Sequence, residues 1–370
     1  MPGMNGCCCF AGLAAVTLPS LGAAEWRQLV STPREQGYAM PPEWAPHERC
    51  WMAWPCREEH WGERIAAARQ AHADVAKAIA AFEPVTMIAR PELTAEASLH
   101  CGQGISVLPL EYDDSWIRDT APTFVRNAEG LLAGVDWPFN GYGGRSPEYA
   151  QDAALAERIC RRLKLPRFVG PIVLEGGAIH VDGEGTALMC AESVLDPRRN
   201  PGLGRAAVEA ALHDHLGVET VIWLPKGLVD DASGGHVDNL ACFAGPGRVL
   251  ALGGGEADDP NRPILEDNLA RLRAARDAKG RELEVIEIPQ PAARHREDGR
   301  RLTASYINFY LANGAIIVPI FEDPMDGTAF HAIQAAFPDR QIVEIDAFDL
   351  IYGGGGIHCI TQQQPKSGAE

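Results

Sequence analysis

Residues 178–190 have the sequence AIHVDGEGTALMC, in which two apolar runs flank the turn DGEG at 182–185. Apolar runs on both sides of a glycine-containing turn predict a β-hairpin. Three further stretches share the pattern, with predicted strands at 123–126 and 131–137, 237–243 and 248–252, and 305–311 and 315–318. Their turns lie near residues 128, 246 and 313, so the hairpin recurs about every 60 residues.

Each hairpin is followed by a helical pattern and then by a short β-rich segment. The helical patterns span 150–163, 204–216, 263–278 and 328–337, and the β-rich segments span 167–174, 220–224, 284–288 and 341–345. A fifth unit is predicted from the two ends of the chain, with a strand at 49–53, a helix at 65–82, a strand at 85–89 and a C-terminal run, 356–360, that pairs near the start. Pairing the two ends removes the edge strands of the sheets. The sequence therefore predicts one α/β domain over residues 31–370. We expect a closed five-bladed α/β propeller of ββαβ units with pseudo-five-fold symmetry, and an open α/β sheet is the alternative.

Charge and cysteine content restrict the partners. The chain has 370 residues, with 33 Lys+Arg against 50 Asp+Glu and a net charge of -17. Such a chain repels phosphate backbones and attracts small cations, so we expect no nucleic-acid partner. The ten cysteines contain no CxxC pair and favour a reducing compartment, which predicts a cytoplasmic protein.

The N-terminal residues 1–30 are predicted to form an extension. Residues 7–24 are uncharged and largely apolar and end in Gly22-Ala23-Ala24, yet no Lys or Arg precedes them. The extension is therefore interpreted as disordered chain or as a cleaved signal, and in the second case the protein would be exported. No segment is apolar enough to span a bilayer, so no membrane association is expected.

Four predicted units carry a reactive side chain at the start of their hairpin. These side chains are Asp119, Glu175, His236 and Cys359, and Asp238 lies two residues after His236. In a strand, His236 and Asp238 would point to one face, whereas His358 would point away from Cys359. Because equivalent positions of a radial repeat converge on its axis, we expect one pocket that combines three carboxylates, an imidazole and a thiol.

This set of groups favours covalent chemistry on a cation. A facial triad of His, Asp and Glu could hold a metal, but no second His stands at helical spacing and no metal site is expected. GxSxG, GxxxxGK[ST] and a dinucleotide fingerprint are absent from the sequence, so no cofactor is expected. A guanidinium is planar and charged, and two carboxylates can hold its N–H groups while a thiolate attacks its carbon. Trp116 offers an aromatic face beside Asp119.

The order of several motifs resembles the agmatine deiminases, which have the pentein fold of the guanidine-modifying superfamily and are related to bacterial peptidylarginine deiminases. The motifs are MPPEW at 40–44, WIRDT at 116–120, LEGG at 174–177, GHVDN at 235–239, SYINFY at 305–310 and GGIHCITQQ at 355–363. The resemblance covers about residues 40–365. It implies a five-bladed α/β propeller that hydrolyses agmatine to N-carbamoylputrescine and ammonia, a step of putrescine and polyamine metabolism, without metal or cofactor.

The resemblance also implies a role for each reactive residue. Cys359 would attack the guanidinium carbon and form a covalent thiouronium, and His236 would act as general acid and base. Glu175 would orient the His236 ring. The residues implied in substrate binding are Trp116, Asp119, Asp238 and Gly356.

One loop departs from the family pattern. In 231–236, DASGGH, Ala232 and Gly234 stand where the family carries larger polar side chains that would face the non-reacting end of the substrate. Smaller residues would suit a longer guanidino- or diguanidino-amine, unless Asp230 or Asp231 supplies the missing charge. A deiminase of free or peptidyl arginine, an amidinotransferase and a non-catalytic binding propeller are the other hypotheses, and a homo-oligomer is a family-level expectation.

Overall fold

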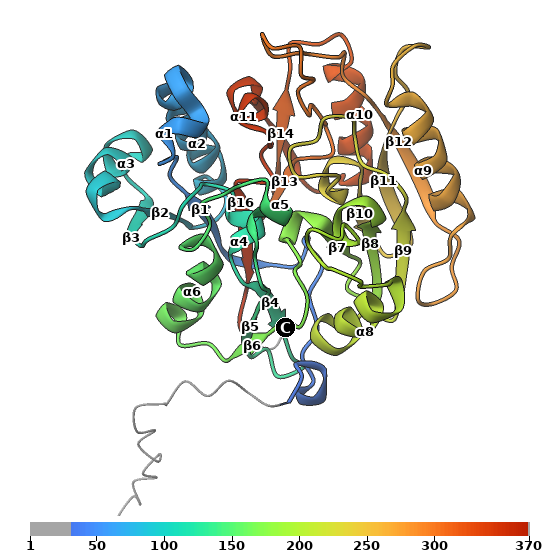
Figure 1. The fold of residues 1–370 in the computed structure, drawn as a ribbon, viewed down its shortest axis with the longest axis horizontal. Helices are drawn as coiled ribbons and strands as arrows, with labels where there is room; N and C mark the ends of the chain where they lie inside the picture. Colours follow the sequence, from blue (N-terminus) through green and yellow to red (C-terminus); the bar gives the residue numbers. More distant parts are fainter. Residues whose placement is uncertain (1–30, 369–370) are drawn as a thin grey trace, which may run out of the picture.

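The structure, a computed structural model, describes residues 31–368, and the predicted extension at 1–30 lies outside the described residues. Within that range the strands form five separate sheets (Figure 1). Four sheets have three strands in the order of the chain, β4-β5-β6, β7-β8-β9, β10-β11-β12 and β13-β14-β15, and the fifth has the order β16-β1-β2-β3.

Each three-stranded sheet is an antiparallel hairpin followed by a helix and a parallel strand. The first unit contains β4 (Thr123–Arg126), β5 (Leu132–Asp136), α6 (Leu155–Leu163) and β6 (Arg167–Val169). The second contains β7 (Ile179–Val181), β8 (Thr186–Cys190), α8 (Arg205–Leu216) and β9 (Thr220–Leu224). The third contains β10 (Ala241–Gly245), β11 (Arg248–Gly253), α9 (Arg262–Ala274) and β12 (Glu284–Pro289). The fourth contains β13 (Tyr310–Ala312), β14 (Ala315–Ile320), α10 (Asp326–Ala336) and β15 (Gln341–Asp346). The predicted order of strand, strand, helix and strand is thus present in all four units.

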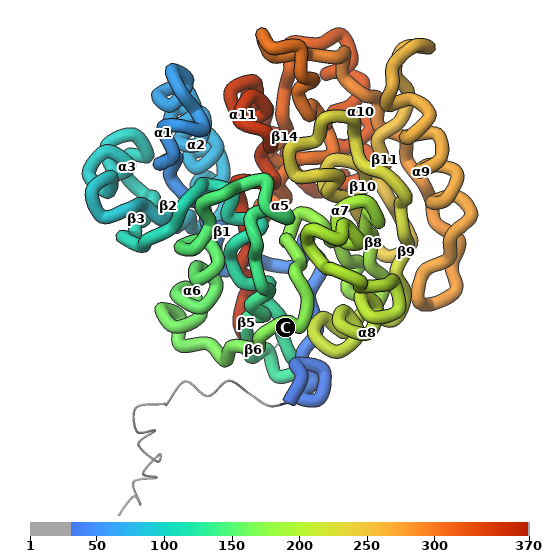
Figure 2. The backbone as a smooth tube through the Cα atoms, in the orientation of Figure 1, coloured from blue at the N-terminus to red at the C-terminus, as the bar shows by residue number. Residues whose placement is uncertain are grey.

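The fifth sheet joins the two ends of the described chain. β16 (Thr361–Pro365) pairs antiparallel with β1 (His47–Ala53), as the N-terminal and C-terminal colours meeting in Figure 2 show. After α2 (Ile65–Ala80), β2 (Val85–Ala89) pairs parallel with β1. α3 (Thr94–Cys101) then leads to β3 (Ile105–Pro109), which adds a strand that the prediction did not include.

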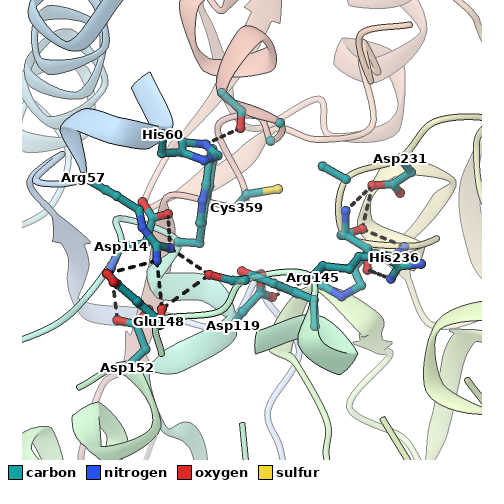
Figure 3. A pocket seen from close by; sticks show the side chains of 18 of the residues that line it. Arg57, His60, Asp114, Asp119, Arg145, Glu148, Asp152, Asp231, His236 and Cys359 are labelled. Carbon is teal, nitrogen blue, oxygen red and sulfur yellow. Dashed lines mark hydrogen bonds and ion pairs between the residues drawn. The ribbon is translucent and has the colours of Figure 1, made fainter. Parts of the chain in front are cut away.

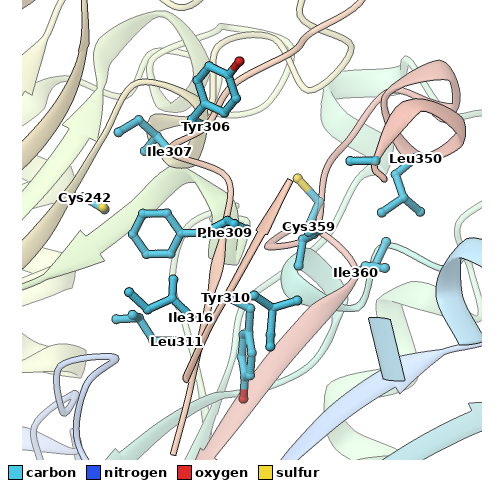
Figure 4. Packing of buried hydrophobic residues seen from close by; sticks show 14 of the residues in the cluster. Cys242, Tyr306, Ile307, Phe309, Tyr310, Leu311, Ile316, Leu350, Cys359 and Ile360 are labelled. Atoms are coloured by element: carbon cyan, nitrogen blue, oxygen red, sulfur yellow. The ribbon is translucent and has the colours of Figure 1, made fainter. Parts of the chain in front are cut away.

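The hydrophobic core lies between the sheets and the helices, and Figure 1 shows α3, α6, α8 and α9 at the periphery. Strands covered on both faces are apolar along their length, and Ile316, Ile317 and Val318 of β14 are fully buried. Figure 4 shows Leu311 and Ile316 in the same packed region as Cys359, and these residues belong to one buried cluster. The Cys359 side chain is therefore packed within the hydrophobic core. Among the described helices, none combines the length and the apolar character needed to cross a membrane.

Three strand starts differ from the prediction. Residues 237–239 form the short 3-10 helix η6 (Val237–Asn239), β13 begins only at Tyr310, and the C-terminal strand begins at 361 after a turn rather than at 356. Polar side chains in these segments bond to nearby backbone and compete with strand ladders. The Ile307 backbone N–H, for example, donates to Ser305 Oγ at 3.2 Å. His236 and Asp238 consequently do not lie in a strand, and their side chains are not placed on one face by strand geometry.

Candidate active site

A cavity of about 760 Å³ opens among the turns that precede the sheets (Figure 3). Trp116, Asp119, His236 and Cys359 line it. Glu175 and Asp238 do not line the cavity, and their side chains are buried. The predicted reactive residues therefore occupy one region of the molecule, in two layers.

The reactive side chains lie in corresponding turns. Each turn comes just before the first strand of a sheet, with Asp119 in α4 (Ile117–Thr120), Glu175 before η5 (Gly176–Ala178), His236 before η6 and Cys359 before β16. Irregular backbone at these points allows the side chains to leave the strand direction and meet. The reactive side chains thus come together because they lie in turns. For His236 and Asp238 we had instead expected one shared face of a strand.

Gly177 is the point at which these groups meet. Its N–H donates to Asp119 Oδ1 at 2.9 Å. A Cβ atom at this position would lie 2.6 Å from His236 Nδ1 and 2.8 Å from Asp238 Oδ2. Only a residue without a side chain leaves room for the imidazole and the carboxylate together.

The His236 ring lies between two carboxylates. Its Nδ1 is 3.7 Å from Asp119 Oδ1, and its Nε2 is 3.9 Å from Glu175 Oε2. Burial favours the neutral ring, but the charges of Asp119 and Glu175 raise the pKa of His236 to about 9. The ring is consequently an imidazolium at neutral pH and has a proton to donate.

Glu175 is held by a cation that the sequence did not reveal. Arg199 Nε donates to Glu175 Oε1 at 2.7 Å, and both side chains are fully buried. Burial alone would raise the pKa of Glu175, but the neighbouring His236 ring and the Arg199 guanidinium lower it to about 2. Glu175 therefore stays ionised beside the imidazole across the physiological range.

The Cys359 thiol lies in an anionic environment. Asn308 Nδ2 donates to its Sγ at 3.3 Å, and Asp238 Oδ2 is 3.6 Å from the same sulfur. Burial raises the pKa of Cys359 well above its usual value, and the charges of Asp238 and Asp119 raise it further. The thiol beside these carboxylates is therefore protonated, and a cation bound to them would make its ionisation easier.

The two carboxylates proposed to bind substrate differ in their partners, because both oxygens of Asp119 accept a hydrogen bond whereas one oxygen of Asp238 does not. Tyr142 Oη donates to Asp119 Oδ2 at 2.9 Å, and His358 Nδ1 donates to Asp238 Oδ2 at 3.0 Å. Asp238 Oδ1 is buried and accepts no hydrogen bond from any described residue. A buried carboxylate oxygen without a donor favours the binding of a ligand that supplies N–H groups.

The glycine-rich segment before Cys359 shapes another wall. A Cβ atom at Gly355 would lie 2.6 Å from the Trp116 ring, so this glycine allows close packing beside the thiol. The Trp116 ring packs on Trp61, with 5.7 Å between ring centroids. Gly356, predicted to bind substrate, lies against Asn308 and is not among the residues that line the cavity.

The unusual loop at 231–236 contributes unequally to the cavity. Ala232 and Asp231 line it, whereas Gly234 does not. The space that a side chain would take at Gly234 is filled by the Arg145 guanidinium, and Gly234 has φ +82°. Gly234 therefore accommodates Arg145 and does not widen the cavity, contrary to the sequence-based expectation. Asp231 Oδ1 accepts bonds from the backbone N–H and hydroxyl of Ser233.

Five functional neighbours were not predicted as site residues. They are Glu43, Tyr142, Arg199, Asn308 and His358. Glu43, Asn308 and His358 lie inside quoted motifs, so those motifs were the available signal, whereas Tyr142 and Arg199 lie outside them. Among residues 31–368, no group of three or more His, Cys, Asp or Glu side chains is arranged to hold a metal ion.

Comparisons with known proteins show which proteins this chain resembles. The sequence profile of the Porphyromonas-type peptidyl-arginine deiminases matches residues 39–365. The agmatine deiminase of Stutzerimonas stutzeri is 45% identical over 365 residues, which cover 91% of this chain and 98% of the relative. The agmatine deiminase of Ectopseudomonas mendocina is 42% identical over 365 residues, with 91% and 98% covered. The solved structure of Enterococcus faecalis agmatine deiminase superposes with a TM-score of 0.88 at 36% identity, covering 92% of this chain and 99% of that one.

Proposed function

The chain belongs to the Porphyromonas-type peptidyl-arginine deiminase family, and from this premise we propose that it hydrolyses agmatine to N-carbamoylputrescine and ammonia. The observation that carries the proposal is a thiol facing a cavity beside an imidazolium and two buried carboxylates, of which Asp238 has an oxygen without a donor. This set fits hydrolysis of a C–N bond in a guanidinium. The product and its alkylamine tail connect the reaction to putrescine biosynthesis.

Binding of the guanidinium uses the unpartnered Asp238 oxygen and the Asp119 carboxylate. Its N–H groups donate to Asp238 Oδ1 and to Asp119, in charge-assisted bonds that fix the plane of the group. The Trp116 ring supplies an aromatic face to the same cation. These contacts present the guanidinium carbon to Cys359 Sγ and partly neutralise the two carboxylates that disfavour the thiolate.

The first chemical half forms a covalent intermediate. The Cys359 thiol loses its proton to solvent as the cation binds, and the thiolate forms an S–C bond to the guanidinium carbon. The C–N bond then breaks while the His236 imidazolium gives its proton to the departing nitrogen, so that ammonia leaves. The product of this half is a thiouronium on Cys359 and a neutral His236.

The second half consumes water. Neutral His236 takes one proton from a water molecule, whose oxygen bonds to the thiouronium carbon. The S–C bond then breaks while the remaining hydroxyl proton passes through solvent to the departing Cys359 sulfur, so that the neutral ureido product leaves and the thiol is restored. Glu175, held by Arg199, keeps the ring oriented and stabilises its charged form in both halves. His236 ends as the imidazolium with which it started.

For the fold, we propose that the single domain over residues 31–370 is a closed five-bladed α/β propeller with pseudo-five-fold symmetry. Two observations support it. β16 of the C-terminal end pairs with β1, and α2 packs against β14 and β15 of the neighbouring sheet, as α9 packs on β9 and α10 on β12. The same helix-on-preceding-sheet contact thus continues across the two ends of the chain.

Ammonia release tests the activity. The panel contains agmatine, arginine, guanidinobutyrate, an arginine peptide and a long diguanidino-amine, each with the wild type and Cys359→Ser. We expect agmatine to be preferred and Cys359→Ser to lose at least about 1000-fold in rate, because a hydroxyl is a far weaker nucleophile near neutral pH. Turnover by the serine variant near the wild-type rate would exclude the covalent mechanism.

A longer guanidino- or diguanidino-amine is the second candidate substrate. The small Ala232 side chain at the wall of a cavity of about 760 Å³ favours it. Preference for the long compound over agmatine would establish it. Absence of ammonia with every compound would contradict the deiminase proposal and favour a transferase or a binding role.

A further inference from the structure

His358 precedes the reactive cysteine but does not line the cavity. Its side chain is buried, and its two ring nitrogens face two different carboxylates. Nδ1 lies 3.0 Å from Asp238 Oδ2, and Nε2 lies 2.9 and 3.1 Å from the two carboxylate oxygens of Glu43. The ring therefore connects the proposed guanidinium-binding carboxylate to a residue of the MPPEW motif 315 positions away.

This geometry defines the protonation state of the ring. A neutral imidazole has one N–H donor and one acceptor nitrogen, whereas ionised carboxylates only accept. Both ring nitrogens of His358 face carboxylate oxygens, so only the imidazolium satisfies both contacts. Although burial and Arg118 oppose it, the carboxylates of Glu43 and Asp238 raise the pKa of His358 above its usual value.

Glu43 is kept ionised by the groups around it. Arg118 Nη1 lies 3.4 Å from Glu43 Oε1, and His180 Nε2 lies 3.5 Å from Glu43 Oε2. Burial would raise the pKa of Glu43, but the charges of His358 and Arg118, together with the hydrogen bond from His180, hold it well below its usual value. The groups that face His358 are thus Glu43, Asp238 and the more distant Arg118 and His180, and the two carboxylates are the ones in hydrogen-bond contact.

The hydrogen bond from His358 gives the two oxygens of the Asp238 carboxylate different roles. Oδ2 accepts from His358 and lies 3.6 Å from Cys359 Sγ, while Oδ1 remains without a donor. An imidazolium on Oδ2 fixes the rotation of the carboxylate and directs Oδ1 to an incoming N–H group. It also offsets the negative charge that lies beside the sulfur.

We propose that Glu43 and His358 are positioning residues for deimination, in which a buried Glu43–imidazolium–Asp238 bridge orients Asp238 and lowers the cost of forming the Cys359 thiolate. The inference rests on the proposed function, because Asp238 is taken to bind the guanidinium. The bridge acts only while His358 is protonated. Loss of that proton, or of either end of the bridge, releases Asp238 Oδ2.

The decisive experiment is the pH profile of kcat/KM for ammonia release by Glu43→Gln. Removal of the Glu43 charge lowers the pKa of His358, so the ring loses its proton at lower pH. We expect the alkaline limb of the profile to move to lower pH by about 1 to 3 units, the range over which one nearby opposite charge shifts a pKa. In the His358→Asn background, Glu43→Gln should cause no such movement, because no proton remains to be lost.

The chain offers a matched control in a second buried His–Glu pair. His47 Nδ1 lies 3.1 Å from Glu83 Oε2, away from the cavity. Glu83→Gln and Glu43→Gln should both lower the melting temperature, but Glu83→Gln should leave the position of the alkaline limb unchanged. Equal profiles for Glu43→Gln and Glu83→Gln would overturn the inference, since a purely structural role lowers activity without moving the limb.

A second measurement does not need turnover. His358→Asn removes the imidazolium but can still donate one hydrogen bond to Asp238, so its fold is the better preserved. Its kcat/KM should fall about 10- to 100-fold, the usual effect of losing a charged hydrogen bond, and iodoacetamide should alkylate Cys359 more slowly, as followed by peptide mass spectrometry. Unchanged alkylation would also overturn the inference. If the wild type releases no ammonia while Cys359 is still alkylated more slowly in His358→Asn than in the wild type, the result contradicts the proposed function but not the bridge.

Discussion

Three buried carboxylates share one site, and each has a different counterpart. Glu175 is paired with Arg199, and Asp238 is bonded to His358. Within residues 31–368, the hydrogen-bond donors to Asp119 are a phenol and a backbone N–H. Burial raises the pKa of Asp119, and the charges of Asp238 and Glu175 oppose the pull of His236. Asp119 is thus the carboxylate that a bound cation would stabilise most.

Asp119→Asn tests this difference at the residue scale. The substitution preserves shape but removes the charge that would meet the guanidinium. We expect kcat/KM for agmatine to fall at least about 100-fold, corresponding to the loss of a charged hydrogen-bond partner. Steady-state kinetics would measure this.

Glu148→Gln is the control for Asp119→Asn, because Glu148 lines the same cavity but its side chain is 82% exposed. It should change kcat/KM by no more than a few-fold. Equal losses in the two variants would mean that the charge of the whole cavity, rather than Asp119 itself, governs binding.

The pKa of His236 also makes a prediction about stability. Its folded-state pKa of about 9 lies above the ordinary 6.5, so the folded protein holds this proton more tightly than the unfolded chain. The resulting stabilisation is fully present below about pH 6.5 and is lost as pH rises through about 9. The free energy of unfolding in urea should therefore decrease between pH 6.5 and 9.5 more steeply in the wild type than in His236→Asn. Parallel curves would show that the ring is not protonated in the folded state.

At the scale of single elements, η5 tests how closely the site is packed. Gly177→Ala would place a methyl group against His236 Nδ1 and Asp238 Oδ2, the two nearest atoms to its Cβ position. We expect the variant to fold and to lose at least about 10-fold in kcat/KM, because catalytic groups tolerate little displacement. Circular dichroism and ammonia release would measure the two properties.

Gly327→Ala is the control for the same change in open space. Gly327 lies in α10, and apart from its chain neighbours and the backbone of its own helix no atom of the described residues lies within 4 Å of its Cβ position. Ala should therefore raise helix stability slightly and leave activity unchanged. A Gly177→Ala enzyme as active as Gly327→Ala would mean that His236 and Asp238 can separate without cost.

The elements also show what the sequence can and cannot predict. Hairpin turns and apolar runs are local signals. The repeat, most helix bounds and strands such as the one at 220–224 were therefore predictable. The strand assigned to 237–239 was wrong, because Asp238 and Asn239 make side-chain bonds that reach other units. Arg199 could not be predicted as a partner of Glu175, since their contact joins residues 24 positions apart in an irregular segment. Reactive residue types are visible in a sequence, whereas the groups that set their charge are brought together by the fold.

At the scale of the whole molecule, a buried network connects the fifth sheet (β16-β1-β2-β3) to the β13–β14 hairpin of the fourth unit. Glu83 accepts hydrogen bonds from Tyr310 Oη at 2.6 Å and from the Asn313 backbone N–H at 2.7 Å, besides the contact with His47. The Asn313 side chain bonds in turn to the His47 backbone at 2.9 Å through both of its polar atoms. These contacts join segments more than 220 residues apart beside the β1–β16 pairing.

If this junction closes a ring, weakening it should destabilise the entire domain and not one sheet. Glu83→Gln and Tyr310→Phe should each lower the free energy of unfolding by about 1 to 3 kcal/mol, because each leaves a buried polar group without its partner. The double variant should lose less than the sum of the two, since both substitutions remove the same bond. Urea unfolding followed by tryptophan fluorescence would give these values. Amide exchange in β14 should show the same decrease in protection as amide exchange in β8, which lies far from the junction in the chain. Loss of protection confined to the fifth sheet and the β13-β14-β15 sheet would instead indicate an open structure whose two ends separate locally. The edge of an open structure can fray without the other sheets, whereas opening of a ring exposes every sheet to the same global unfolding equilibrium.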